Sequence, residues 1–274
     1  MRYFLGLVYG MVYGVALVVP GLSGGTFLVI FGCYDVVCEA FSLNIKSIKK
    51  NFLFLACFGI GAAGGLIGFV HAIVYLLASF GVQTSLFFMG LILGGIPMIY
   101  KLATQDEKVK PICLLPFLIG LSVVVSLFAM ESLGMFGTDL SQDADFIFVI
   151  RIIIYSFFAA LAMIMPGISG AFVLVAFGVY DLFMEALRGL EFTVIIPAGI
   201  GVVLGIVVGA KLVLLVINKF KLMVYSAIMG MVVGSIAPLF PSGVGLNIAT
   251  LIGVVCLAAG GWITIMLGKR EHAE

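Results

Sequence analysis

The sequence predicts an all-α polytopic membrane protein built from two inverted structural repeats, and three observations predict it. The first is composition: 64% of the residues are hydrophobic and 10% are charged, whereas a soluble domain carries about 25% charged residues. The second is a series of apolar runs close to the roughly 20 residues that cross a bilayer as a helix. The third is a motif that occurs twice.

The repeated motif is a Pro-Gly-x-Ser-Gly break inside apolar sequence. Residues 20–40 read PGLSGGTFLVIFGCYDVVCEA and residues 166–186 read PGISGAFVLVAFGVYDLFMEA, so that 12 of 21 positions are identical at an offset of 146. Further along, the similarity continues at an offset of 140, as in Gly59-Ile60-Gly61 and Gly199-Ile200-Gly201. Matching breaks in two halves of one chain are typical of transporters built from internal repeats.

Each half is expected to contain a hairpin with a re-entrant or broken helix, followed by three transmembrane helices. The first repeat covers residues 1–130, the second covers 146–274, and an external polar joint at 131–145 connects them. The expected segments, in order, are the hairpin 3–41 and helices 52–80, 84–100 and 111–130, then the hairpin 146–187 and helices 193–217, 222–240 and 247–267.

The distribution of basic residues predicts the orientation. Most lysines and arginines fall on one side if three full spans follow each hairpin, and the positive-inside rule makes that side cytoplasmic, with both termini there. An odd number of crossings per half inverts the second half. Ten full spans fit the charges equally well; hairpins are favoured because their tips would meet near the midplane, buried in protein or lining a cavity.

The break itself is suited to binding an anion. Pro20 ends the preceding helix, and Ser23 is expected to cap a helix that begins near Thr26. A helix start with free backbone N–H groups, a positive dipole end and a hydroxyl is a phosphate site. The expected phosphate-binding residues are Ser23, Gly24, Gly25 and Thr26 in the first copy and Ser169 and Gly170 in the second. The alternative is a tight turn without a ligand.

Three basic residues lie within or beside apolar runs. His71 and Lys211 are equivalent at the offset of 140, and Arg151 begins the second hairpin. Charged groups in hydrocarbon usually face a cavity or a partner, so each is a candidate to complement a phosphate. Snorkelling to the membrane interface is the alternative for Lys211 and Arg151.

Four carboxylates lie at the far end of the two motif helices: Asp35, Glu39, Asp181 and Glu185. A carboxylate near the membrane can take up a proton and couple transport to the proton gradient. The alternative is a solvated helix end.

No metal site or cofactor is expected, since the five cysteines are scattered without a close Cys or His ligand pair. No nucleic-acid partner is expected either, and the sequence leaves a homo-oligomer open.

The segments VVPGLSGGTFLVIFGCYD and IMPGISGAFVLVAFGVYD resemble the bacterial and archaeal polyprenyl-phosphate transporter family over essentially the whole chain. The resemblance implies a flippase, not an enzyme, that moves undecaprenyl phosphate across the cytoplasmic membrane and so recycles the lipid carrier of cell-wall biogenesis. It also implies a headgroup site at 20–26 and 166–171, and partners that are the polyprenyl-phosphate lipid and membrane lipids. Ala171-Phe172 departs from the first copy, where Gly25-Thr26 stands, which leaves the second tip's role open.

Two other functions compete with this interpretation. A polyprenyl-pyrophosphate phosphatase would need a nucleophile or activated water, an acid or base and a clamp on the phosphates, and neither a deep carboxylate pair nor an arginine accompanies the serines. A secondary transporter for a small anion would use the same broken helices.

Overall fold

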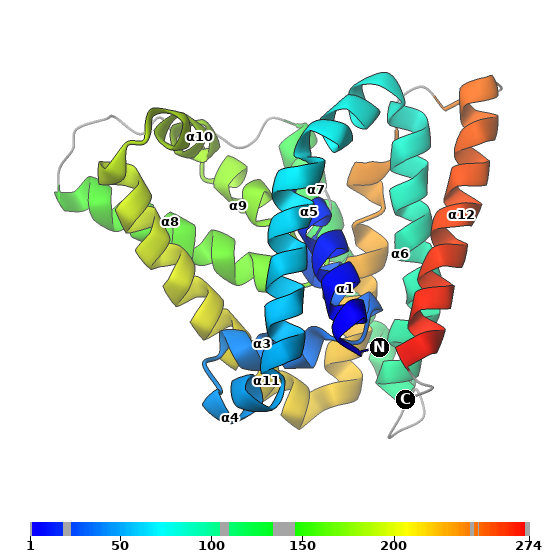
Figure 1. Cartoon of the computed structure of the whole chain (residues 1–274), viewed down its shortest axis with the longest axis horizontal. Coiled ribbons are helices and arrows are strands. Elements are labelled where there is room, and N and C mark those ends of the chain that lie inside the picture. Colours follow the sequence, from blue (N-terminus) through cyan, green and yellow to red (C-terminus); the bar gives the residue numbers. More distant parts are fainter. Residues whose placement is uncertain are drawn as a thin grey trace.

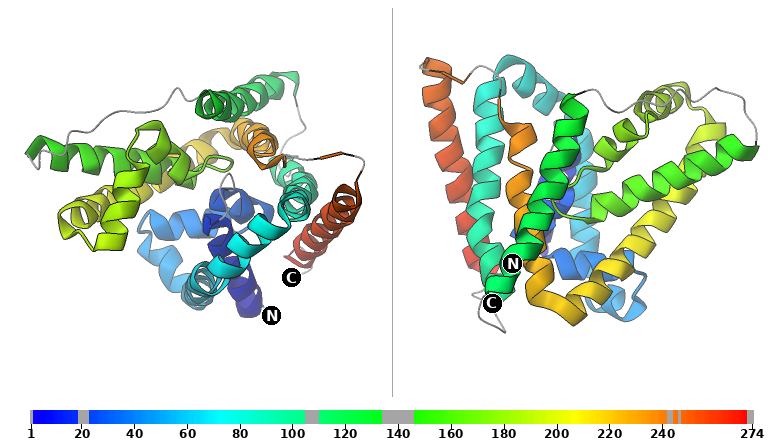
Figure 2. Two further views of the ribbon diagram at one scale, coloured as in Figure 1. Left: turned by 90° about the horizontal axis from the view of Figure 1, so that it is seen from above. Right: turned by 180° about the vertical axis from the view of Figure 1, so that it is seen from behind.

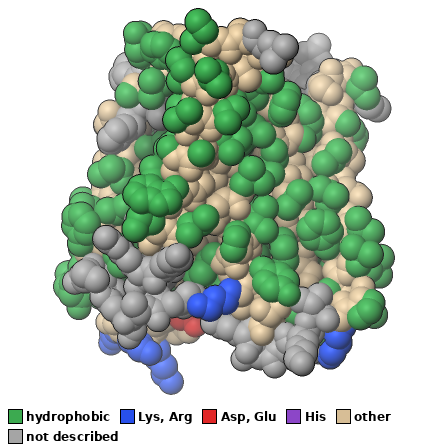
Figure 3. All heavy atoms as spheres, turned by 90° about the vertical axis from the view of Figure 1, so that its right-hand side faces the viewer, with side chains coloured by type: hydrophobic (Ala, Val, Ile, Leu, Met, Phe, Trp, Pro, Cys, Tyr) green, Lys and Arg blue, Asp and Glu red, His purple; other side chains and the backbone are tan. Residues whose placement is uncertain are grey.

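The computed structural model describes residues 2–18, 23–104, 110–133, 146–241, 244–245 and 247–271. Every regular element within these ranges is a helix (Figure 1), which confirms the all-α prediction. Among the residues whose side chains are described, five helical segments are long and apolar enough to cross a membrane, namely Gly81–Thr104, Pro111–Met130, Phe146–Ile164, Phe192–Leu239 and Ile248–Met266. One side of the molecule is apolar over most of its height, with Lys and Arg side chains at its lower edge (Figure 3).

The first half of the chain begins with a broken hairpin and continues into long helices. Gly32 interrupts the hairpin, taking a positive φ of 66° between two of its short helices. The elements are α1 (Arg2–Val18), α2 (Gly24–Ile30), α3 (Tyr34–Phe41), α4 (Ile45–Lys50), α5 (Phe52–Ser79), α6 (Gly81–Thr104), the 3₁₀ turn η1 (Pro111–Cys113) and α7 (Leu114–Ser132). Pro20 lies outside the described residues.

The second half repeats this order, except that it has no counterpart of α4. Gly178 has a φ of 66°, identical to that of Gly32. Most of the joint 131–145 lies outside the described residues. The elements are α8 (Phe146–Ile164), α9 (Gly170–Ala176), α10 (Tyr180–Gly189), α11 (Phe192–Gly234), the 3₁₀ turn η2 (Ala237–Leu239) and α12 (Ile248–Glu271).

Helix α11 contains both of the helices expected at 193–217 and 222–240, joined at a kink. It runs without an intervening loop but is kinked at Phe220, whose φ of −137° and ψ of 46° are not helical. Phe80, between α5 and α6, has nearly the same angles, −135° and 43°. The two kinks are 140 residues apart, so the repeat found in the sequence extends to backbone conformation.

Equivalent helices of the two halves run in opposite directions in the view of Figure 1. Helix α5 rises from the lower end, whereas the first part of α11 descends toward it. Helices α3 and α4 lie at the lower end, where α1 begins and α12 ends, and α10 lies at the upper end. The inverted repeat relative to a membrane stays a prediction, and this arrangement supports it.

Close helix pairs recur at equivalent places in the two halves. Helix α1 packs along α5, and α8 packs along the first part of α11. A Cβ atom on Gly61 would meet the carbonyl oxygen of Leu7, and one on Gly201 would meet that of Ile153. Because Leu7 and Ile153 are 146 apart and the two glycines 140 apart, these contacts are equivalent. Small residues allow this close approach of helix backbones.

The last helices of each half are exchanged between the halves. Helix α12 packs along α6, and α7 packs along α11. A Cβ on Gly90 would meet the carbonyl of Leu257, and one on Gly230 would meet that of Phe117. The two repeats therefore interlock and do not form two separate bodies, as the two views of Figure 2 also show.

The two hairpins are not buried equally. Phe31 and Tyr34 in the first have 1% and 2% of their surface exposed, whereas the equivalent Phe177 and Tyr180 are half-buried. Helices α2 and α3 pack against α6 and α11, respectively, while α9 and α10 pack mainly against α8 and the first part of α11. The first hairpin is thus enclosed by the bundle and the second lies at its periphery.

Candidate functional site

The two Pro-Gly-x-Ser-Gly breaks lie against each other in the structure. The backbone N–H of Gly167 donates a hydrogen bond to Thr26 Oγ1 at 2.8 Å, and Ser23 Oγ donates to the carbonyl of Met165 at 3.3 Å. The hydroxyl of Tyr34 donates to the carbonyl of Ile164 at 2.9 Å. We call this contact, formed by residues 23–26, Tyr34 and residues 164–167, the tip junction.

Each break exists because the sequence cannot continue a helix there. Helix α8 ends at Ile164, two residues before the proline of its motif. This places carbonyl groups that lack a helical partner next to the break. Ile164 and Met165 offer such carbonyls, and Tyr34 and Ser23 of the other hairpin use them as acceptors.

Ser23 is the N-cap residue of α2, as the sequence suggested, but its side chain does not cap the helix. Helix α2 begins at Gly24 rather than near Thr26, and the Ser23 side chain forms no capping hydrogen bond. The physical reason is competition: the carbonyl of Met165 lies within reach of the hydroxyl, and this long-range contact takes the place of a local one. Ser23 is 3% exposed, so in this conformation its hydroxyl is part of the tip junction.

Close backbone contact at the tip junction requires glycine at two positions. Gly167 has a φ of 84°, in the region that glycine adopts readily, and a Cβ there would lie 2.5 Å from the carbonyl oxygen of Met231 on α11. A Cβ on Gly25 would lie 3.1 Å from the carbonyl oxygen of Ile164. The first break therefore packs on the second, and the second packs on α11.

The predicted phosphate-binding residues are brought together only in part. Ser23, Gly24, Gly25 and Thr26 are all buried, and Thr26 is 0% exposed. Ser169 and Gly170 are half-buried at the start of α9. The side chains of Ala171 and Phe172, where the copies differ, lie outside the described residues.

The predicted basic residues are not part of the tip junction. Lys211 is exposed on α11 and Arg151 is exposed on α8. On the same face of α11 as Lys211, Val208 and Leu215 are also exposed, at 37% and 64%, so this face is largely apolar. His71 lies on α5, and its side chain is outside the described residues.

Asp35 is the predicted carboxylate with the most structured surroundings. Its carboxylate accepts a hydrogen bond from the Tyr225 hydroxyl of α11, with Lys221 and Glu39 nearby. Asp35 keeps access to solvent, yet burial against α11 raises the pKa of its carboxyl above the ordinary 3.8, while Lys221 acts in the opposite direction. Asp181 and Glu185 are exposed on α10, and Glu39 is half-buried on α3.

Sequence reasoning missed Tyr34 and Tyr225. Tyr34 is part of the repeated motif, paired with Tyr180, so the repeat held a signal for it. Tyr225 has no such signal, because Ser85 occupies the equivalent position at the offset of 140. Only the packing of α3 on α11 shows that Tyr225 meets Asp35.

Replacing Tyr34 by phenylalanine is expected to lower the stability of the protein by about 1–3 kcal/mol, because the buried carbonyl of Ile164 loses its hydrogen-bond donor. Tyr180→Phe is the matched control, since Tyr180 has the equivalent place in the second hairpin and is only half-buried. Thermal unfolding of the purified variants in detergent measures the difference. Equal midpoints for the two variants would contradict a role of Tyr34 in holding the hairpins together.

No group of three or more His, Cys, Asp and Glu side chains is placed to hold a metal ion in the part of the chain that the structure describes.

Comparison with known proteins points to one family. Residues 2–113 and 87–251 match the family described as undecaprenyl phosphate translocase-like. A protein of Staphylococcus aureus named polyprenyl-phosphate transporter is 28% identical over 97% of this chain and 96% of its own length. A Vibrio cholerae protein of the same name is 25% identical over 88% of this chain and 79% of its own. No solved structure shows significant similarity. The chain, with its two breaks in contact, belongs to the undecaprenyl phosphate translocase-like family.

Proposed function

We propose that this protein is a flippase that moves undecaprenyl phosphate or a related polyprenyl phosphate across the bacterial cytoplasmic membrane. The observation that carries the proposal is the tip junction: two broken hairpins of a member of this family reach each other through Thr26 and Gly167. Broken helices that meet between repeats form the substrate sites of many transporters.

The chemistry of the substrate explains why such a site is needed. A lipid phosphate must carry a charged headgroup through hydrocarbon while its tail stays among lipids. Backbone N–H groups at the starts of α2 and α9 and the hydroxyls of Ser23, Thr26 and Ser169 would replace water around the phosphate. Lys211, His71 and Arg151 would offset its charge when the headgroup passes their level.

Unequal burial of the hairpins supports a mechanism of alternating exposure. The first hairpin is enclosed and the second is peripheral, so the junction is closed on the side of α3. In the opposite state the repeat relation predicts the mirror contacts, with α9 against the second part of α11 and α10 against α6. Exchange between the two states would expose the junction first to one leaflet and then to the other.

The orientation follows from charge. The end that holds α3, α4, the start of α1 and the end of α12 (Figure 1) carries Lys46, Lys49 and Lys50. By the positive-inside rule this end faces the cytoplasm, with both termini there. Entry from outside and release inside would return the lipid carrier for reuse, and Asp35 is the carboxylate best placed to couple this movement to a proton.

Flux of a fluorescent polyprenyl phosphate between leaflets of liposomes that contain the purified protein tests the proposal. We expect protein-dependent flipping, slowed at least about tenfold by Lys211→Ala and by His71→Ala, since an unmatched charge in the membrane costs about 2.5–3.5 kcal/mol. Lys101→Ala, at the exposed end of α6, is the control and should flip as the wild type does.

The same liposomes distinguish the alternatives. Release of inorganic phosphate from polyprenyl pyrophosphate would indicate a phosphatase, and uptake of a soluble anion without lipid flipping would indicate a small-anion transporter. Either result would overturn the flippase proposal. Normal flux in both the Lys211 and His71 variants would remove these two residues from the pathway and leave the tip junction as the site.

A further inference from the structure

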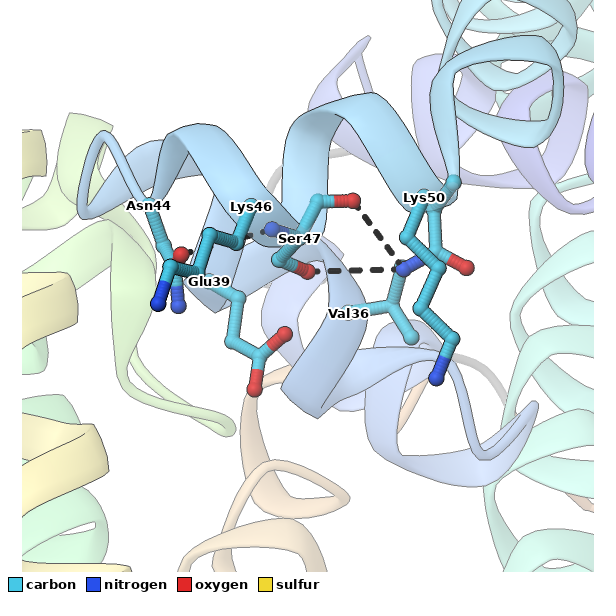
Figure 4. A pocket seen from close by; sticks show the side chains of 7 residues that line it. Val36, Glu39, Asn44, Lys46, Ser47 and Lys50 are labelled. Atoms are coloured by element: carbon cyan, nitrogen blue, oxygen red, sulfur yellow. Dashed lines mark hydrogen bonds between the residues drawn. The ribbon is translucent and has the colours of Figure 1, made fainter.

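An open pocket of about 370 Å³ lies between α3 and α4, and none of its lining residues belongs to the tip junction. Figure 4 shows the side chains that line it, with Glu39 from α3 and the others, except Val36, from α4 and its two ends. The lining residues are Val36, Glu39, Asn44, Lys46, Ser47, Lys50 and Asn51.

Two cations of the pocket lack an acidic partner. Lys46 and Lys50 are four residues apart on α4 and therefore lie on one face of the helix, where like charges repel. Both are exposed, and in the described part of the chain neither forms an ion pair. In Figure 4 they extend on either side of Ser47. An anion between them would relieve the repulsion.

The neutral side chains of the pocket are held in place and can donate hydrogen bonds. Asn44 accepts a hydrogen bond from the backbone N–H of Ser47 at 3.3 Å, which leaves the Asn44 amide N–H groups available. Asn51 donates to the Ser47 carbonyl at 3.2 Å and to its hydroxyl oxygen at 3.4 Å, so that the Ser47 hydroxyl proton can point to a ligand. Glu39 is the single acid of the lining.

The surroundings of the pocket suit a lipid. Four large apolar side chains beside it are strongly exposed: Leu43 at 62%, Ile45 at 66%, Phe52 at 65% and Leu53 at 50%. Basic residues next to exposed apolar ones are typical of a helix at the membrane interface. A ligand here can therefore place a phosphate on the lysines and a hydrocarbon chain along the apolar side chains.

Helix α4, which forms one wall of the pocket, has no counterpart between α10 and α11, where the structure describes every residue. Residues 42–51 connect α3 to α5, whereas residues 190–191 alone connect α10 to α11. Helix α4 accounts for the change of offset from 146 to 140. In a chain whose halves otherwise repeat, a site present at one end only makes the two ends of the pathway chemically different.

We propose that the pocket between α3 and α4 binds the phosphomonoester headgroup of a lipid at this end of the molecule. A phosphomonoester carries about −1.5 to −2 charges near pH 7 and three acceptor oxygens, so it can bind both lysines although Glu39 is part of the same lining, whereas a phosphodiester lipid offers a single charge and fewer free oxygens. The site is separate from the tip junction, and its occupancy does not depend on transport.

Hydrogen–deuterium exchange of the full-length protein in phosphatidylcholine nanodiscs gives a local readout. Undecaprenyl phosphate is expected to protect the amides of residues 45–51, and phosphatidylglycerol at the same mole fraction is not. Lys46→Ala and Lys50→Ala should each weaken this protection about tenfold in lipid concentration, because each removes one charge-assisted hydrogen bond. Lys49→Ala is the matched control: it removes the same charge from α4 but does not line the pocket.

The outcomes separate the sources of the phosphate. Equal protection by phosphatidylglycerol, or an equal loss in Lys49→Ala, would overturn the proposal in favour of general attraction to anionic lipid. Equal protection by inorganic phosphate would overturn the assignment to a lipid. Protection of residues 45–51 in a protein that does not flip lipid would sustain this site while the flippase proposal fails. Glu39→Gln should tighten binding, and weaker binding would contradict the placement of the phosphate.

Discussion

Gly167→Ala is expected to reduce flipping at least about tenfold and to destabilise the protein. A side chain at a positive φ costs about 1–3 kcal/mol, and the new Cβ would lie 2.5 Å from the Met231 carbonyl oxygen, which adds about 1–3 kcal/mol of overpacking. Relief of this contact moves the N–H of Gly167 away from Thr26, and the tip junction opens. Liposome flux and thermal unfolding measure the two effects.

A glycine in open surroundings provides the control. Gly199 has no atom within 4 Å of an added Cβ, so Gly199→Ala should flip lipid at the wild-type rate. If Gly167→Ala does not fold, Thr26→Val tests the same contact more gently, since it removes the acceptor and keeps the shape of the side chain. Wild-type flux in Thr26→Val would show that the junction between the hairpins is not needed for transport.

Asp35→Asn is expected to abolish the pH response of the contact between α3 and α11. The pKa of Asp35 is raised by burial, so the closed contact binds the proton more tightly than an open one. Its stability therefore rises as the pH falls through the raised pKa toward the ordinary 3.8 and is lost again as the pH rises. Asparagine keeps an oxygen for Tyr225 and carries no charge to desolvate.

Hydrogen exchange of α3 between about pH 7 and pH 4, corrected for the intrinsic exchange rate, checks this expectation. Wild-type α3 should become better protected at the lower pH, and the Asp35→Asn variant should be equally protected at both. The control is Asp181→Asn, which changes the equivalent and exposed residue of α10 and should leave the response intact. A pH response that persists in Asp35→Asn would assign it to another group, with Glu39 the nearest candidate.

Much of the fold could be predicted from the sequence, because the length of each apolar run and the repeated motif are properties of short segments of the chain. The runs at 52–80, 84–100 and 111–130 correspond to α5, α6 and α7 within a few residues, since an apolar stretch bounded by turn residues forms a helix wherever it lies in the membrane. The helices expected at 193–217 and 222–240 correspond to the two parts of α11, which meet at a kink. A single non-helical residue, Phe220, turns the chain there without a loop, within the polar stretch Asn218-Lys219-Phe220-Lys221.

The sequence predicted which backbone segments form the candidate site, but not which residues their side chains contact. The repeated break identified residues 23–26 and 166–170, because Pro and Gly act on the chain where they stand. The partners of Ser23 and Thr26 could not be predicted, since Met165 and Gly167 lie more than 140 residues away. The contact of Asp35 with Tyr225 could not be predicted either, because the residue equivalent to Tyr225 in the first half is Ser85.

By itself the sequence determined that this is a helical membrane protein of two related halves, each interrupted by the same break, because composition and periodic repetition survive in any arrangement of the helices. Only the tertiary structure decided that the two breaks touch, that α7 and α12 are exchanged between the halves, and that the first hairpin is enclosed while the second is peripheral. The physical reason is that such contacts depend on which distant surfaces meet, and the repeated motif is compatible both with an enclosed hairpin and with a peripheral one.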